Sequence, residues 1–234
     1  MTRSAELLVQ PGGATGAEVR GIALLLHGGA VNGHGRPSRL AALGLNAPAK
    51  RLAELGQGAG VAVVRLRYRF RGWNGAEAST LADTEWALET LRRDHGDVPV
   101  VLVGNSLGGR AAFRAAGHPN VVAVAGVAPW LPPGEPVEQL AGRRVLIVHG
   151  DRDRSDASAA DSLAYAERAR PVTDVRRLEV AKAGHFLLTR ADDVWAVTTD
   201  FTLDTLTGRE PSRLPPEEPS APLRTPLPIG YGTR

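Results

Sequence analysis

Apolar residues are concentrated in short runs along the chain, and most of these runs are rich in valine. Short apolar runs bounded by turn residues are typical of strands that are buried on both faces of a sheet. We therefore expect a short edge strand over residues 5–9 and buried strands over residues 19–26, 61–68, 98–103, 121–127, 144–148 and 175–180.

The segments between these runs have the composition and spacing of helices. In one long segment, Ser79 to Arg93, the apolar positions Leu81, Trp86, Leu88 and Leu91 predict the buried face of a helix. Further helices are predicted over residues 49–55, 107–116, 157–168 and 192–207. The alternation of strands and helices indicates an α/β fold, in which a mostly parallel central sheet carries helices on both faces.

Two stretches depart from this alternation. Residues 30–48 are rich in glycine and proline, and such long connections in compact domains are often functional or mobile. From residue 209 onward, repeated prolines exclude a regular helix or a central strand. We predict one globular domain over residues 1–208, which carries all the candidate catalytic residues below. Residues 209–234 are predicted as a proline-rich tail, extended or disordered and draped over the body, rather than as a partner-binding segment.

Composition narrows the class of protein. A chain of 234 residues, 43% hydrophobic and 23% charged, suits one domain with a sizeable core. It contains no cysteine, which excludes disulfides, a thiolate nucleophile and zinc–thiolate sites. The formal net charge of +3 gives no strong field, so we expect no nucleic-acid partner. Arginines alternate with apolar residues from Arg65 to Arg71, as in a strand that leaves the sheet, with binding of an anionic substrate as the alternative.

The sequence also sets expectations about location and metals. Residues 1–12 lack the apolar stretch of a secretion signal, and no apolar run approaches the length of a membrane span. A cytoplasmic protein without a membrane span is therefore the default expectation. The histidines at positions 34, 95, 118 and 149 lack the spacing of metal ligands, so no metal site is predicted. Nothing in the pattern indicates the oligomeric state.

The most informative motif is Gly-Asn-Ser-Leu-Gly over residues 104–108, between a predicted strand and a predicted helix. In this context a Gly-x-Ser-x-Gly sequence turns the chain sharply and exposes a strained serine. The glycines avoid a collision across the turn, and the N terminus of the helix favours negative charge near the serine. We interpret Ser106 as a candidate nucleophile, with an ordinary strand-to-helix turn as the alternative.

A serine nucleophile needs a base, and the base needs an acidic group that orients it. His185 follows a predicted strand and is the candidate base, since the carboxyl ends of parallel strands meet at one edge of the sheet. The acid is expected after the preceding strand, where Asp153 is favoured because it lies past the turn and can approach the histidine. Asp151, which is expected to cap the turn, and Asp156 are the alternatives.

The oxyanion formed during acyl transfer needs two backbone donors. One candidate is the amide of Leu107, directly after the serine. The other is expected from the loop that begins at His27, where consecutive glycines permit close approach of a ligand. Gly29 is the favoured donor and Ala30 is the second choice, whereas His27 is expected to brace the loop through hydrogen bonds.

Substrate contacts are expected at the same edge of the sheet. Trp73 and Trp130 each follow a strand end and are candidates for an apolar pocket wall, with ordinary packing as the alternative. Asn105, beside the candidate nucleophile, is a further candidate substrate contact. Trp86 and Trp195 lie within predicted helices and are expected in the core.

The order Ser106, Asp153, His185, with His-Gly-Gly upstream at residues 27–29, resembles the α/β-hydrolase superfamily over about residues 19–207. The short body is similar to small dienelactone-hydrolase-like and esterase-like members, although dienelactone hydrolases proper usually have a cysteine nucleophile. Many members insert a helical cap domain after the strand that corresponds to the one predicted over residues 121–127. Only residues 129–142 are available at that point, so no sizeable cap domain is expected.

The resemblance implies an α/β-hydrolase fold and a serine hydrolase that cleaves a small-molecule ester or thioester through an acyl-enzyme. It implies no metal and no organic cofactor. An acyltransferase, an amidase or a C–C hydrolase would use the same three residues. A hydrolase-fold protein that is kept for binding, with a silent site, is the alternative from a different functional class.

Overall fold

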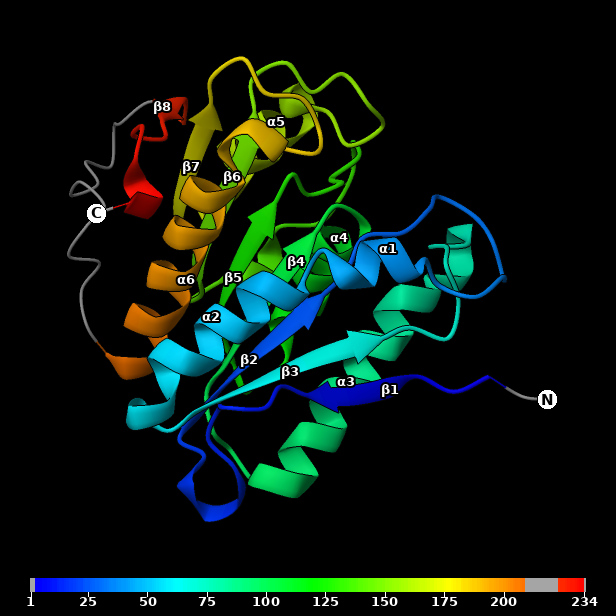
Figure 1. Cartoon of the computed structure of the whole chain (residues 1–234). Coiled ribbons are helices and arrows are strands. Elements are labelled where there is room, and N and C mark those ends of the chain that lie inside the picture. The colour runs from blue at the N-terminus through cyan, green and yellow to red at the C-terminus, as the bar shows by residue number, and fades with distance from the viewer. Residues whose placement is uncertain (1–2, 209–222, 234) are drawn as a thin grey trace.

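The computed structural model describes residues 3–208 and 223–233, which form one eight-stranded sheet flanked by helices (Figure 1). The strands are β1 (Glu6–Val9), β2 (Gly21–Leu26), β3 (Val61–Arg67), β4 (Val100–Asn105), β5 (Val121–Val127), β6 (Arg144–Gly150), β7 (Asp174–Val180) and β8 (Thr225–Pro226). Their order in the sheet is β1-β3-β2-β4-β5-β6-β7-β8. β1 pairs antiparallel with β3, and the other neighbouring strands pair in parallel. The predicted α/β arrangement is therefore confirmed.

Helices cover both faces of the sheet. They are α1 (Arg39–Leu43), α2 (Asn46–Gly56), α3 (Ser79–His95), α4 (Leu107–Arg114), α5 (Ala159–Ala169) and α6 (Ala191–Thr207). Buried residues of α3, α4 and α5 belong to one hydrophobic cluster, and those of α2 and α6 belong to a second one. The sheet lies between these two clusters, so its central strands have no face exposed to water.

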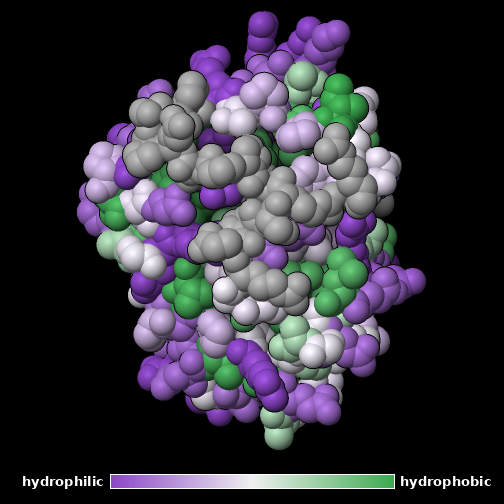
Figure 2. All heavy atoms as spheres, turned by 90° about the vertical axis from the view of Figure 1, so that its left-hand side faces the viewer, coloured by the Kyte–Doolittle hydropathy of each residue, from purple (hydrophilic) through white to green (hydrophobic). Residues whose placement is uncertain are grey.

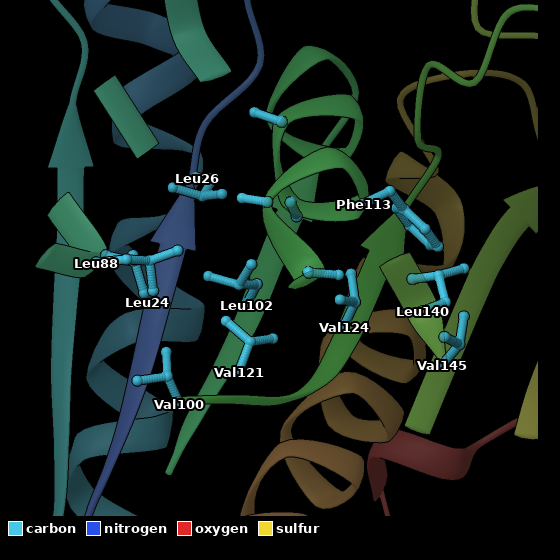
Figure 3. Packing of buried hydrophobic residues seen from close by; sticks show 14 of the residues in the cluster. Leu24, Leu26, Leu88, Val100, Leu102, Phe113, Val121, Val124, Leu140 and Val145 are labelled. Atoms are coloured by element: carbon cyan, nitrogen blue, oxygen red, sulfur yellow. The ribbon is translucent and has the colours of Figure 1, made fainter. Parts of the chain in front are cut away.

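The sequence of β2 shows why an uninterrupted apolar run forms a strand here. Successive side chains of a strand point to opposite faces. Ile22, Leu24 and Leu26 accordingly pack in the first cluster, whereas Ala23 and Leu25 pack in the second. Figure 3 shows the first cluster, where side chains from neighbouring strands meet the helix that carries Phe113. A strand in this position must be apolar throughout, which explains the valine-rich runs.

The connection between β5 and β6 is short. Residues 128–143 contain a single three-residue 3₁₀ helix, Glu138–Leu140, so no helical cap is inserted at this point. Within the described residues, no helix combines the length and the apolar character that crossing a membrane requires.

Two predictions about local structure were wrong. The stretch 30–48 is not loop throughout, because α1 lies within it and α2 begins at Asn46. Trp86 is not in the core, since its exposed fraction is 42%. Leu88 and Leu91 are buried as predicted, and Thr80, Thr84 and Ala87 belong to the same buried set of α3. Threonine can occupy a buried helix face when its hydroxyl bonds the preceding turn, as Thr84 does with Thr80 O at 2.7 Å.

The last described segment, residues 223–233, packs against the body. Leu223, Leu227 and Tyr231 are buried, and β8 extends the sheet beside β7. Figure 2 shows this side of the molecule, on which hydrophilic residues predominate and hydrophobic ones form small separate patches. Residues 209–222 lie outside the described residues, so the division into 1–208 and 209–234 stays a prediction.

Candidate active site

Ser106 occupies a sharp turn between β4 and α4. Its backbone has φ 52° and ψ −116°, a combination that costs energy for any residue with a side chain. The turn is held on both sides, because Ser106 N–H donates to Val127 O at 3.0 Å and Ser106 O accepts from Trp130 N–H at 3.0 Å. A Cβ atom at Gly108 would lie only 2.2 Å from Leu26 O, so this position requires glycine. The local sequence thus forces the serine into its strained conformation.

His185 and Asp153 lie beside the serine. His185 is in the loop between β7 and α6, and its Nε2 is 3.0 Å from Ser106 Oγ. Its Nδ1 is 2.7 Å from Asp153 Oδ2, and Asp153 follows β6. The structure therefore brings together the three candidate residues in a continuous hydrogen-bonded chain. The alternatives Asp151 and Asp156 are both exposed to solvent.

The carboxylate of Asp153 is buried and fully hydrogen-bonded. Oδ1 accepts from the N–H of Ser155 at 3.0 Å and from its hydroxyl at 2.7 Å. Oδ2 faces His149 as well as His185. Burial by itself would raise the pKa of Asp153, but the hydrogen bonds from His149, Ser155 and His185 outweigh it and hold that pKa well below the usual value. Asp153 is therefore an anion across the working range of an ordinary enzyme.

The loop after β2 faces the serine through its backbone. A Cβ atom at Gly29 would lie 2.4 Å from Arg71 O, so the loop can approach this closely only with glycine. The N–H of Ala30 donates to the same carbonyl at 2.9 Å and is already engaged. Within the described residues, the N–H groups of Gly29 and Leu107 donate to no backbone carbonyl, so both are available for the predicted oxyanion role. Ala30, the second choice from the sequence, does not fit this role.

His27 contacts the backbone of this loop. Its Nδ1 lies 2.7 Å from Gly28 O, and its ring contacts Tyr68 edge-on at 4.7 Å between ring centres. Burial lowers the pKa of His27, partly offset by the contact with Gly28 O. The imidazole is buried, so it braces the loop, as the sequence predicts.

A pocket of about 940 Å³ opens beside Ser106 and His185. Asn105 lines it and is fixed by its side-chain N–H bond to Val127 O at 3.0 Å. One wall comes from the stretch between β2 and α2, and the other comes from residues 186–195. Trp195 contributes to the second wall, although the sequence predicted it in the core. Its position in the first turns of α6, directly after the loop that carries His185, could have indicated this.

Trp73 and Trp130 do not line this pocket, so their prediction as a pocket wall was wrong. They lie instead against the guanidinium of Arg110, at 3.9 Å and 4.4 Å from the two ring centres. Arg110 also pairs with the buried carboxylate of Glu135 at 2.6 Å. A guanidinium stacks favourably on aromatic faces, so this arginine joins the two strand-end loops to the first turn of α4. The tryptophans therefore lie against Arg110, close to the turn around Ser106, rather than along the pocket.

Sequence reasoning missed His149, the last but one residue of β6. Its ring is completely buried, with Nε2 3.0 Å from Asp153 Oδ2 and 2.9 Å from Ala157 O. From the sequence, His149 is assessed only as a metal ligand. Its place four residues before Asp153, at a strand end, was the signal that was available. Within the part of the chain that the structure describes, no three side chains are grouped as metal ligands.

Comparison with known proteins places this geometry in a known fold. No family model and no curated protein matches the sequence. A protein of unknown function from Agrobacterium tumefaciens, described as an α/β hydrolase, is 22% identical, with a TM-score of 0.64 over 87% of this chain and 92% of that one. A serine hydrolase without a lid from Xanthomonas campestris is 17% identical, with a TM-score of 0.56 over 83% and 91%.

A third similar structure is esterase 2 from Thermogutta terrifontis, solved after modification by tabun. It is 14% identical, with a TM-score of 0.64 over 86% of this chain and 89% of that one. Likenesses at such identities establish architecture and not activity. The chain has the α/β-hydrolase fold, without a sizeable cap domain.

Proposed function

We propose that the protein is a serine hydrolase that cleaves a carboxylic ester or thioester. The observation that carries the proposal is the chain of contacts from Ser106 Oγ to His185 Nε2 at 3.0 Å, and from His185 Nδ1 to Asp153 Oδ2 at 2.7 Å. A silent binding protein would have no need to keep these three groups aligned, whereas acyl transfer requires them.

The contacts assign a role to each nitrogen of His185. Asp153 is ionised and only accepts, so Nδ1 carries the hydrogen and Nε2 is free to take the proton of the serine hydroxyl. Ser106 Oγ attacks the carbonyl carbon while its proton moves to Nε2. The bond to the leaving oxygen or sulfur then breaks, and the leaving group takes that proton. Water then attacks the carbonyl carbon of the acyl-enzyme while its proton moves to Nε2. The bond to Ser106 Oγ breaks, and Oγ takes that proton back.

The backbone supports the charge that develops on the carbonyl oxygen. The amides of Leu107 and Gly29 are the donors in this proposal, and Leu107 begins α4, so its N–H has no acceptor within the helix. The positive end of the helix dipole adds to the same effect. The mostly apolar pocket beside Ser106 fits a small-molecule ester, and the esterase from Thermogutta terrifontis shares this architecture.

The proposal is tested by the hydrolysis of p-nitrophenyl and thioester substrates of increasing acyl length. Ser106→Ala should lower kcat by roughly 10⁴- to 10⁶-fold, because the nucleophile is lost while the oxyanion donors remain. Ser4→Ala changes an exposed serine that is distant from Ser106 in the sequence. It is the matched control and should leave the rates unchanged. Turnover at the wild-type rate in Ser106→Ala would reject the nucleophile assignment.

The open pocket also favours one alternative activity, in which an alcohol or amine accepts the acyl group in place of water. Without a cap domain, an alcohol or amine can approach an acylated Ser106 as easily as water can. Reactions that contain added methanol or glycine amide therefore separate the hydrolase from an acyltransferase. A hydrolase should form mainly the free acid, and predominant transfer to the added nucleophile would replace hydrolysis by acyl transfer as the activity.

A further inference from the structure

The arginines that alternate with apolar residues at the end of β3 differ in their surroundings. Arg67 pairs with Glu6, Arg69 pairs with Asp83, and Arg65 bonds the side chain of Asn46. Arg71, the last of the series, lines the pocket beside Ser106. Within the described residues, its guanidinium makes no hydrogen bond and no ion pair. Among the described residues, the arginine of this series that has no polar partner is therefore the one that lines the pocket of the candidate active site.

The position of Arg71 is fixed by its backbone and its aliphatic stem. Its N–H donates to Gly35 O at 3.1 Å, and its carbonyl accepts from Ala30 N–H at 2.9 Å. A Cβ atom at Gly33 would lie 2.9 Å from both Cγ and Cδ of Arg71, so glycine at this position lets the loop lie close to the arginine stem. The loop is thus packed against the aliphatic part of this side chain.

A second arginine, Arg36, also lines the pocket. Arg36 belongs to the loop that surrounds the Arg71 stem, and its guanidinium also makes no ion pair with any described residue. The opposite wall, residues 186–195, is mainly apolar, with Leu187, Val194 and Trp195 among its members. Asp192 is the one carboxylate among the lining residues, and it pairs with neither arginine.

We propose that Arg71 and Arg36 form an anion-binding subsite, so that the ester or thioester cleaved at Ser106 carries a negatively charged group. This proposal rests on the proposed function. Neither arginine has a partner of opposite charge among the described residues, and an anionic group on the substrate would supply one. A guanidinium binds the two oxygens of a carboxylate or phosphate in a fork, and both arginine side chains are exposed, so an anionic group of a substrate can reach them.

The test compares esters that differ only in charge. For the acyl half, the pair is the p-nitrophenyl monoester of adipic acid and its methyl-capped diester. For the alcohol half, the pair is 4-acetoxybenzoate and its methyl ester. In one of the two pairs, the wild type should cleave the anionic ester with a higher kcat/KM than the neutral ester. Arg71→Gln should reduce this ratio of anionic to neutral kcat/KM roughly tenfold to hundredfold. The pair that responds shows which half of the substrate carries the charge.

The control is Arg39→Gln, because Arg39 is an exposed arginine close by in sequence that does not line the pocket. It should leave both ratios unchanged. Arg36→Gln should act in the same direction as Arg71→Gln, and Arg71→Lys should keep part of the preference, since it keeps the charge without the fork. Ratios that are equal in the wild type, Arg71→Gln and Arg36→Gln would overturn the subsite.

Binding to Ser106→Ala separates this proposal from the proposed function. Calorimetric titration with monomethyl adipate and with neutral dimethyl adipate needs no turnover. Binding that is selective for the anion and is lost in the Ser106→Ala, Arg71→Gln double variant would support the subsite even if no ester were hydrolysed. An absence of selectivity for the anion would overturn the subsite even if neutral esters were hydrolysed rapidly.

Discussion

The Nε2 atom of His149 lies 3.0 Å from Oδ2 of Asp153, the oxygen that also faces His185. The same Nε2 lies 2.9 Å from Ala157 O, which can only accept a hydrogen bond, so this nitrogen carries a hydrogen. The two histidines therefore donate to one carboxylate oxygen from two sides. Ser155 holds the other oxygen, which leaves Asp153 no freedom to rotate away from His185.

This relationship predicts that His149 positions the carboxylate. His149→Leu should lower kcat about tenfold to hundredfold with little change in KM, because small misalignments of catalytic groups have effects of this size. The acidic limb of the kcat/KM profile should also move to higher pH, since a carboxylate that has lost a donor stabilises the protonated imidazole more strongly. Steady-state kinetics over a pH series measures both effects.

His149→Gln is the conservative control, because its amide can still donate to Asp153. It should recover much of the rate and return the pH profile toward that of the wild type. A His149→Leu protein with reduced stability but an unshifted pH profile would show that His149 acts only in packing.

The turn around Ser106 predicts a strong and local dependence on glycine. Gly108→Ala places a methyl group against backbone atoms of Leu26 and His27, which cannot move without disturbing β2. We expect a loss of roughly 2–4 kcal/mol in the free energy of unfolding, as for other overpacked sites. Gly58→Ala is the control, since a Cβ there meets nothing within 4 Å, and its effect should stay below about 0.5 kcal/mol. Urea unfolding measures both, and equal stabilities would refute the predicted collision.

The C-terminal segment is predicted to be part of the stable fold. Leu227 is 3% exposed and its N–H donates to Glu179 O at 2.8 Å, whereas Ile229, two residues later, is 82% exposed. Leu227→Ala should therefore cost about 2–4 kcal/mol, and Ile229→Ala less than about 0.5 kcal/mol. If thermal and urea unfolding showed no difference between these variants, the segment would not be packed against β7 in solution.

Buried His27 predicts a loss of stability in mild acid. Its pKa is lowered in the folded state, so below about pH 6.5 the unfolded chain takes up a proton at this residue and the folded protein does not. The free energy of unfolding should fall as the pH decreases from there, by at most about 1.4 kcal/mol per pH unit from this group. His27→Gln should flatten the curve over this range in urea titrations at each pH. An identical slope in both proteins would assign the acid sensitivity to other groups.

Much of the framework could be predicted from sequence because it depends on local rules. The apolar runs indicated the central strands, since residues such as Ile22 and Ala23 must suit opposite faces of a buried sheet. The Gly-x-Ser-x-Gly motif indicated the turn at Ser106, because only glycine fits where backbone segments come within van der Waals contact. The contact between His185 and Asp153 was predicted because the two residues follow successive strands along the chain, and parallel strands end at the same edge of a sheet.

The errors concern side chains whose surroundings come from distant parts of the sequence. Trp73 and Trp130 were expected at the substrate because they follow strand ends, but Arg110 from α4 occupies the space between them. Nothing in the spacing of these three residues indicates that they stack. His149 and Arg71 were likewise visible as residue types. Only the packing shows that His149 reaches Asp153 and that the guanidinium of Arg71 has no polar partner among the residues that the structure describes.

The central claim is that Ser106 is an activated nucleophile, and labelling with a fluorophosphonate probe tests it most directly. After reaction with the probe, peptide mass mapping locates the adduct in the wild type, in Ser106→Ala and in the Ser4→Ala control. The account predicts one adduct, on the peptide that contains Ser106, in the wild type and in the control, and none in Ser106→Ala. Folded wild-type protein that stays unlabelled, or that is labelled at another residue, would contradict it.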